Sequence, residues 1–195
     1  MRHIFDRIEI IEPAVPDGVS GVWAVSSFEI TQRQSEFSLM RAYQHPMEYV
    51  PPGKYRHLTR DRRTIMSNTP FEIHTNAPII RAGRGRVLIN GLGLGVVLTA
   101  LQKKMDVDEV WVVEQSTDVI ALVWPSFAAD SRMRLCHSDA LTFMPPKRMK
   151  FDAVWHDIWD DVSTENLPQM VALHRKYGRR AAWQGSWARD LIGRF

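Results

Sequence analysis

Residues 87–101 read VLINGLGLGVVLTAL. A short apolar run leads into three alternating glycines, Gly91, Gly93 and Gly95. A stripe of apolar residues at helical spacing begins there: Leu94, Val97, Leu98, Leu101 and Met105. Glycine lets a backbone turn tightly and lie close to a ligand. The stretch therefore predicts a strand, a turn that can hold a ligand, and a helix.

The same alternation continues to the end of the chain. Further apolar runs lie at 110–114, 134–137, 151–157 and 180–184, and helix-like segments start at Asp118 and span Asn166 to Tyr177. Near-continuous apolar strands separated by helices are typical of a parallel sheet covered on both faces. We therefore predict an α/β fold: a Rossmann-like, doubly wound, mostly parallel sheet of about five strands.

The first part of the chain has a different pattern. Turn signals punctuate it, and residues 21–31 and 55–66 have the composition of a strand and of a hairpin turning at Arg60-Asp61. Thr69, Pro70 and Glu72 have the spacing of a capping box and predict a helix over 70–82. The predicted organisation is a small β-rich region with a connecting helix over residues 1–83, then a Rossmann-like domain over 84–195.

Composition sets broad limits. The 195-residue chain is 45% apolar and 24% charged with a net charge of +3, and it has one cysteine, Cys136. No apolar run is long enough to cross a membrane, and the N-terminus lacks a signal-peptide core, so we expect a cytoplasmic protein. The basic stretch 54–63 is interpreted as the solvated face of a hairpin, with contact to a polyanion such as nucleic acid as the alternative.

Carboxylates follow the next two predicted strands. Glu114 lies 23 residues after Gly91, where it can accept both hydroxyls of a ribose, and Asp139 next to Ala140 can receive an adenine amino group. Val96 occupies the position where a dinucleotide fingerprint needs a small residue, so the G-x-G-x-G spacing suits a nucleoside cofactor without a pyrophosphate. The alternatives are a turn without a ligand, a surface Glu114, and an Asp139 that caps a short helix.

These motifs carry a family resemblance. VLINGLGLG, VWVVEQSTDVI, SDALTF and FDAVWHDIWDD, taken in order, resemble the motifs of class I S-adenosylmethionine-dependent methyltransferases, and within them the spermidine-synthase-like branch. The chain is also similar to small methyltransferase-like proteins of bacteriophages, which would place it in a host cytoplasm. The resemblance covers roughly residues 65–185. It implies S-adenosylmethionine as the cofactor, bound by Gly91, Gly93, Gly95, Glu114, Asp139 and Ala140.

The fourth predicted strand of this domain ends in His156-Asp157-Ile158-Trp159-Asp160. Asp157 and Asp160 match the spacing of the paired aspartates of polyamine synthases, and such carboxylates can hold and deprotonate an amine. We expect Asp157 to face the ligand and His156 to face away. The alternatives are that the aspartates cap the helix near Ser163–Asn166, or that they bind a metal together with His156. The tryptophans at 155, 159, 183 and 187 are interpreted as core residues or as pocket walls.

The chain also departs from the resemblance. Leu94 stands where polyamine synthases have an acidic residue that meets the cofactor's amine. Their Tyr-Gln pair corresponds most nearly to Pro70-Phe71-Glu72; the capping box accounts for Glu72, and the alternative is that it faces the pocket. The Asn/Asp-Pro-Pro-aromatic stretch of amine-directed DNA methyltransferases is missing, and Cys136 lies inside a predicted strand. Only 11 residues follow Gln184, so the edge of the sheet is predicted to be bare, or covered by residues 1–83 or by a second subunit in a homodimer.

The sequence thus predicts an S-adenosylmethionine-dependent methyltransferase that acts on an amine- or hydroxyl-bearing small molecule, with Asp157 and Asp160 as the catalytic residues. Two alternatives stay open. One is a spermidine-synthase-like aminopropyltransferase, and the other is a protein that binds the nucleoside without catalysis and acts on a partner.

Overall fold

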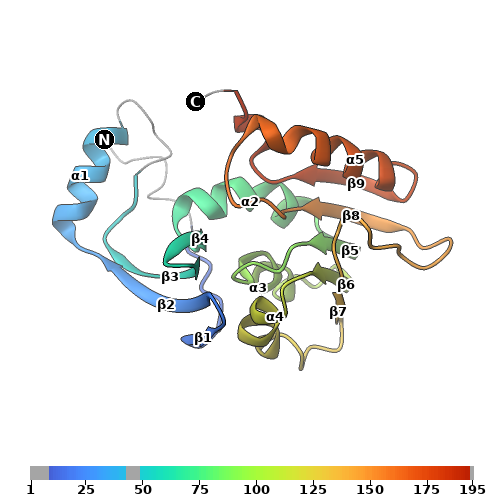
Figure 1. Ribbon diagram of the computed structural model, residues 1–195, viewed down its shortest axis with the longest axis horizontal. Helices are drawn as coiled ribbons and strands as arrows, with labels where there is room; N and C mark the ends of the chain where they lie inside the picture. Colours follow the sequence, from blue (N-terminus) through green and yellow to red (C-terminus); the bar gives the residue numbers. More distant parts are fainter. Residues whose placement is uncertain (1–8, 43–48, 194–195) are drawn as a thin grey trace.

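The apolar runs of the second half form one parallel sheet. The protein is represented by a computed structural model that describes residues 9–42 and 49–193. The strands of this sheet are β5 (Gly85–Asn90), β6 (Val107–Glu114), β7 (Met133–His137), β8 (Phe151–His156) and β9 (Ala181–Ser186). Their spatial order is β7-β6-β5-β8-β9, and every neighbouring pair is parallel. The predicted doubly wound α/β fold is confirmed (Figure 1).

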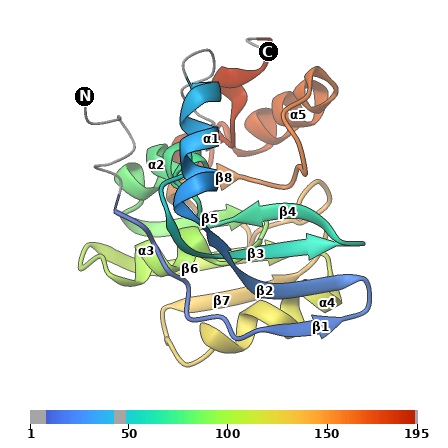
Figure 2. The same cartoon turned by 90° about the vertical axis from the view of Figure 1, so that its left-hand side faces the viewer.

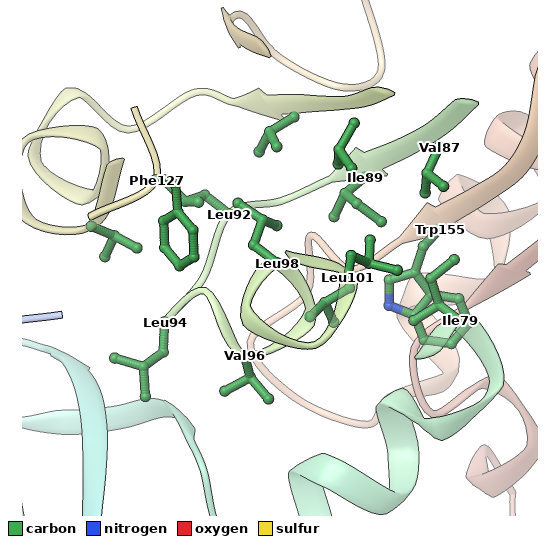
Figure 3. Packing of buried hydrophobic residues seen from close by; sticks show 14 of the residues in the cluster. Ile79, Val87, Ile89, Leu92, Leu94, Val96, Leu98, Leu101, Phe127 and Trp155 are labelled. Atoms are coloured by element: carbon green, nitrogen blue, oxygen red, sulfur yellow. The ribbon is translucent and has the colours of Figure 1, made fainter. Parts of the chain in front are cut away.

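Helices cover both faces of the parallel sheet. They are α2 (Pro70–Ala82), α3 (Val96–Gln102), α4 (Thr117–Val123) and α5 (Leu167–Tyr177). On one face, Ile89 of β5 shares a core cluster with Ile79 of α2 and Leu98 of α3 (Figure 3). On the other face, Leu88 belongs to the cluster of Leu173 in α5. Because adjacent residues of β5 point to opposite faces and both faces are buried, the strand reads as an uninterrupted apolar run.

A separate antiparallel sheet precedes this part of the chain. It contains β1 (Gly18–Ser20), β2 (Trp23–Ile30), β3 (Gly53–Arg60) and β4 (Arg63–Ser67), in that spatial order. The predicted strand and hairpin are therefore confirmed. The hairpin turn, however, lies at Asp61-Arg62, one residue later than predicted. Both turn residues have positive φ, as a two-residue hairpin turn requires if it is to follow the twist of its strands.

The two sheets share one hydrophobic core. Val25 of β2 and Leu58 of β3 belong to the same cluster as Val119 and Val123 of α4, and Ser20 Oγ donates a 2.7 Å hydrogen bond to Asp118. Figure 2 shows β1 and β2 beside α4. Within one chain the first sheet thus packs on the α/β part. The division at residues 83 and 84 stays a prediction, since α2, on its N-terminal side, lies in the layer that covers the parallel sheet.

Two helix predictions need correction. Met105 was assigned to the apolar stripe of α3, but this helix ends at Gln102 and Met105 is 98% exposed, because the chain turns at Lys103–Lys104 to enter β6. The helix α1 (Gln32–Ala42) was not predicted, since its sequence QRQSEFSLMRA is polar over most of its length. Within the described ranges, α1 lies between β2 and β3 in the chain, and none of its residues belongs to the parallel sheet.

β9 is one edge of the parallel sheet. Among the described residues, no strand pairs with its outer side. The predicted homodimer stays a prediction. No helix in the described part of the chain combines the length and apolar character needed to span a bilayer.

The glycine turn after β5 lies directly against the end of β8. Gly91 has φ 100°, and a Cβ atom there would overlap the carbonyl oxygen of Asp157 and lie 2.9 Å from its carbonyl carbon. Backbone hydrogen bonds fix the position of the turn: Gly91 N–H donates to Val113 O and Asp157 N–H donates to Asn90 O, both at 2.8 Å. Only glycine combines this conformation with this approach.

We predict that Gly91→Ala lowers the free energy of unfolding by about 3 kcal/mol or more, because the methyl group adds overlap to a strained φ. Gly193→Ala is the control: Gly193 has φ 83° but nothing lies within 4 Å of an added Cβ. It is expected to cost about 1 kcal/mol, from the backbone conformation alone. Urea unfolding measures both, and equal losses would contradict the steric account.

Candidate functional site

A cavity of about 450 Å³ lies at the carboxyl ends of the parallel strands, where the order of the strands reverses between β5 and β8. Ligands of open α/β sheets bind at this position. Seven of the eight predicted site residues line it: Gly91, Gly93, Glu114, Asp139, Ala140, Asp157 and Asp160. The residues that the sequence placed at four different strand ends therefore surround one space, although the roles assigned to them remain predictions.

Gly95 is the predicted site residue that does not line the cavity. It has φ 81° at the start of α3, and a Cβ atom there would lie 2.6 Å from the ring of Phe127. Gly93 does line the cavity. Its φ is 51°, and a Cβ atom there would lie only 2.6 Å from Met66 Sδ. The third glycine thus allows the helix to pack, whereas the first two shape the site.

Glu114 ends β6 with its carboxylate already positioned. One oxygen accepts a hydrogen bond from Leu92 N–H at 2.9 Å, and the other accepts one from Ser116 N–H at 2.8 Å. Each carboxylate oxygen has a second lone pair, so both can accept a further hydrogen bond from a ligand. Two adjacent acceptors held by backbone amides suit the two hydroxyls of a ribose.

Asp139 follows β7 and starts a turn rather than the short helix considered as an alternative. Its Oδ1 accepts a hydrogen bond from Leu141 N–H at 2.8 Å, which leaves the other oxygen for a ligand. A residue of α5 fixes the backbone of Ala140, because Lys176 Nζ donates a 3.0 Å hydrogen bond to the Ala140 carbonyl oxygen. Hydrogen bonds within the chain therefore position both residues at the edge of the cavity beside β7.

Asp157 lines the cavity and His156 points to the opposite face, as expected from the sequence. Burial raises the pKa of Asp157 to about 7, against the opposing effect of the Trp155 indole N–H. His156 is fully buried on the other face, where its Nδ1 lies 2.8 Å from Asn90 Nδ2, and burial lowers its pKa to about 3. The metal-binding set of His156, Asp157 and Asp160 is therefore wrong, since its members face opposite sides of the sheet.

The alternative in which the aspartates cap the next helix is also wrong. Ser163 performs that role, since its side chain accepts a hydrogen bond from Glu165 N–H at 3.2 Å. Asp160 instead forms an ion pair with Arg60 of β3. A residue of the first sheet thus holds one of the two predicted catalytic carboxylates.

Glu72 lines the cavity, although the sequence favoured a capping-box role for it over a place facing the pocket. The capping-box interpretation is wrong: Thr69 makes no side-chain cap hydrogen bond, and the Glu72 side chain lines the cavity. Burial raises the pKa of Glu72 to about 8, the negative charge of Asp157 adds to the rise, and the Trp187 indole N–H opposes it. The signal available in the sequence was an acidic residue in the helix before the glycine turn, and a capping box has the same spacing.

The first sheet supplies a wall of the cavity. Leu58, Ile65 and Met66 line it, and Leu94 N–H points at Met66 Sδ, 3.2 Å away. Arg60 also lies over the ring of Trp23, 5.3 Å from its centre. In the basic stretch 54–63, Arg60 is thus turned toward the site, and Arg56 forms an ion pair with Asp17.

The four tryptophans divide between cavity and core. Trp159 and Trp187 line the cavity. Trp155 and Trp183 stack on each other, with ring centres 6.1 Å apart and planes inclined by 8°, and do not line it.

Carboxylates outnumber cations around the cavity. They are Glu72, Glu114, Asp139, Asp157, Asp160 and Asp161, against Arg60 and Arg63 among the described residues. Such a site favours a ligand that carries positive charge.

Comparisons with known proteins find no matching protein family and no matching curated protein. Solved structures do match part of the chain. A putative methyltransferase, yhhF, from Escherichia coli is 18% identical with a TM-score of 0.42, and the match covers 58% of this chain and 60% of that one. The N-methyltransferase NodS from Bradyrhizobium japonicum is 15% identical with a TM-score of 0.45, covering 57% and 63%.

An S-adenosylmethionine-dependent methyltransferase from Clostridium acetobutylicum is 14% identical with a TM-score of 0.42, covering 56% of this chain and 43% of that one. Each match spans less than two thirds of the solved chain. At these sequence identities and TM-scores, the matches add no argument about function to the strand order and the lining of the cavity.

The raised pKa of Glu72 has a consequence for stability. A carboxyl group whose pKa is higher in the folded than in the unfolded protein holds its proton more tightly when folded. The free energy of unfolding therefore falls as pH rises from about 4.5 to about 8.

We predict that Glu72→Gln removes this fall and makes the protein more stable than wild type at pH 8, by an amount of order 2 kcal/mol. The difference shrinks toward pH 5. The surface variant Glu165→Gln, which also removes one negative charge, is the control. Urea unfolding at several pH values measures all three proteins. If the two variants follow the same pH dependence, the burial of an ionisable Glu72 is contradicted.

Proposed function

We propose that the cavity binds S-adenosylmethionine and that the protein transfers its methyl group to an amine or hydroxyl of a small molecule. The observation that carries this proposal is the order of the lining residues. Asp139 and Ala140, Glu114, the glycine turn and Asp157 follow one another across β7, β6, β5 and β8 around one cavity. Along this cofactor, adenine is followed by ribose and then by the sulfonium with its amino-acid tail, so partners for adenine, for ribose and for the sulfonium end are needed in that order.

The residues present fit this cofactor. Gly91 and Gly93 line the cavity with backbone alone, and each oxygen of Glu114 can accept one further hydrogen bond. The excess of carboxylates suits a cationic ligand. When bound, the sulfonium supplies an activated methyl group.

In this proposal Asp157 acts on the acceptor. Its carboxylate would accept a hydrogen bond from the acceptor N–H or O–H, orient the lone pair, and take up the proton that the acceptor releases. A pKa raised to about 7 by burial suits this role, because a general base works best when its pKa is near the working pH. The walls of Trp159 and Trp187 would shield the acceptor from water.

Two features favour methyl transfer to a small molecule over the alternatives. Aminopropyl transfer of the polyamine-synthase type uses a free pair of carboxylates, whereas Asp160 is paired with Arg60, and Leu94 replaces the acidic residue of the loop. Two of the five cations of the basic stretch 54–63, Arg56 and Arg60, are paired within the chain, which lowers the positive charge that this stretch can offer a polyanion. A protein that binds without catalysis is distinguished by the Asp157 experiment below.

We predict that Glu114→Ala weakens the binding of S-adenosylhomocysteine strongly, since two charge-assisted hydrogen bonds are lost, each worth about 1.5–3 kcal/mol. Glu109→Ala is the matched control. Glu109 lies on the same strand, outside the cavity, and pairs with Arg86 and Arg134. Isothermal calorimetry compares the three proteins. Equal affinity in wild type and Glu114→Ala, or tighter binding of NAD, would overturn the assignment.

A second prediction separates catalysis from binding. Asp157→Asn should retain binding of S-adenosylhomocysteine but lower the transfer of label from methyl-tritiated S-adenosylmethionine to the small-molecule fraction of a cell extract by about 10²–10⁴-fold. Asp152→Asn, on the same strand but outside the cavity, should leave transfer unchanged. Transfer that is equal in wild type and Asp157→Asn excludes Asp157 as the base. Tight binding without any transfer favours the non-catalytic alternative.

A further inference from the structure

We propose that Glu72 is the binding partner of the cofactor's α-ammonium group. This inference rests on the proposed function, because it assigns one end of the same ligand. Helix α2 belongs neither to the glycine turn nor to the strand ends. In this inference it takes a direct part in cofactor recognition.

The first observation behind this inference is that the Glu72 side chain is buried and lacks a hydrogen-bond partner at one oxygen. The residue is 8% exposed and lines the cavity, and its Oε2 atom is buried without a hydrogen-bond partner among the described residues. A buried carboxylate oxygen without a partner is costly and rare in folded proteins. Because this one borders a cavity, a bound cation would satisfy it.

Two of the other carboxylates that line the cavity are already engaged within the chain. Glu114 binds the amides of Leu92 and Ser116, and Asp160 pairs with Arg60. Leu94, at the loop position where the family resemblance would place an acid, is fully buried in the apolar core (Figure 3). Glu72 can therefore provide the carboxylate that the loop lacks.

The position of α2 explains why the tail of the cofactor, and not the acceptor, would meet Glu72. If adenine and ribose lie beside β7 and β6, the tail extends across the glycine turn toward β8, and α2 packs on β8 and β9. Glu72 is the most buried of the carboxylates that line the cavity, whereas Asp157 and Asp160 are partly exposed. The buried position suits a group that is bound in every turnover, and the more exposed aspartates suit an acceptor that enters and leaves.

The chemistry of the pair is favourable. An ammonium has donors only, and a carboxylate has acceptors only, so they form charge-assisted hydrogen bonds. The raised pKa of Glu72 agrees with this, because a nearby cation would restore its charged form.

Two nucleosides that differ in the tail test the inference. S-adenosylhomocysteine carries the α-ammonium, and 5′-methylthioadenosine lacks the whole amino-acid tail. Wild type is expected to bind S-adenosylhomocysteine more tightly. In Glu72→Gln this preference should fall by about 10–100-fold, while the affinity for 5′-methylthioadenosine changes little. Glu72→Asp, which keeps the charge, should retain more of the preference than Glu72→Gln, and Glu109→Gln should retain all of it.

The outcomes separate the two proposals. If Glu72→Gln binds 5′-methylthioadenosine and keeps the full preference for S-adenosylhomocysteine, the role of Glu72 is wrong and the cofactor site stands. If wild type binds neither nucleoside, the proposed function itself fails. Should Glu72→Gln not fold, wild type can be tested with an S-adenosylhomocysteine analogue whose α-ammonium is replaced by hydrogen. Equal affinity for that analogue and for S-adenosylhomocysteine would overturn the inference.

Discussion

The close approach of the glycine turn to the end of β8 is the constraint on which the site depends. With no side chain at position 91, the turn lies against the carbonyl of Asp157, and the backbone hydrogen bond from Asp157 N–H to Asn90 O holds the two segments together. This contact joins the strands on either side of the point where their order reverses. The Asp157 side chain and the glycine turn therefore line the same cavity. A larger residue at position 91 would separate the parts that the proposed chemistry needs together.

The antiparallel sheet completes the site, although most of it precedes the part of the chain that carries the recognisable motifs. Met66 fills the space beside Gly93, and Arg60 holds Asp160. The cavity is thus closed on one side by residues from another sheet, and this enclosure limits the access of water to Glu72 and Asp157. Their raised pKa values follow from that burial, as does the cost in stability at neutral pH. A protein that keeps two such carboxyl groups beside a cavity gives up stability at a place where a ligand can restore it.

The parts predicted well from the sequence are those set by local patterns. Uninterrupted apolar runs identify strands buried on both faces, and Pro70 at the first position identifies the start of α2. Glu114, Asp139 and Asp157 were found because strand ends in a parallel sheet meet at one edge. The orientation of Glu72 depends instead on α2 packing against β8 and β9, a tertiary contact that no local spacing encodes. The Arg60–Asp160 pair joins residues 100 positions apart, and α1 lacks an apolar stripe, so neither was predictable in this way.

The central claim is that this cavity is an S-adenosylmethionine site, and a crystal structure of the protein grown with S-adenosylhomocysteine tests it most directly. The account predicts density for the ribose hydroxyls on the Glu114 carboxylate, with adenine beside Asp139 and Ala140 and the tail crossing the glycine turn toward β8. Density for the nucleoside elsewhere on the protein, or a cavity that holds only water at saturating ligand, would contradict it.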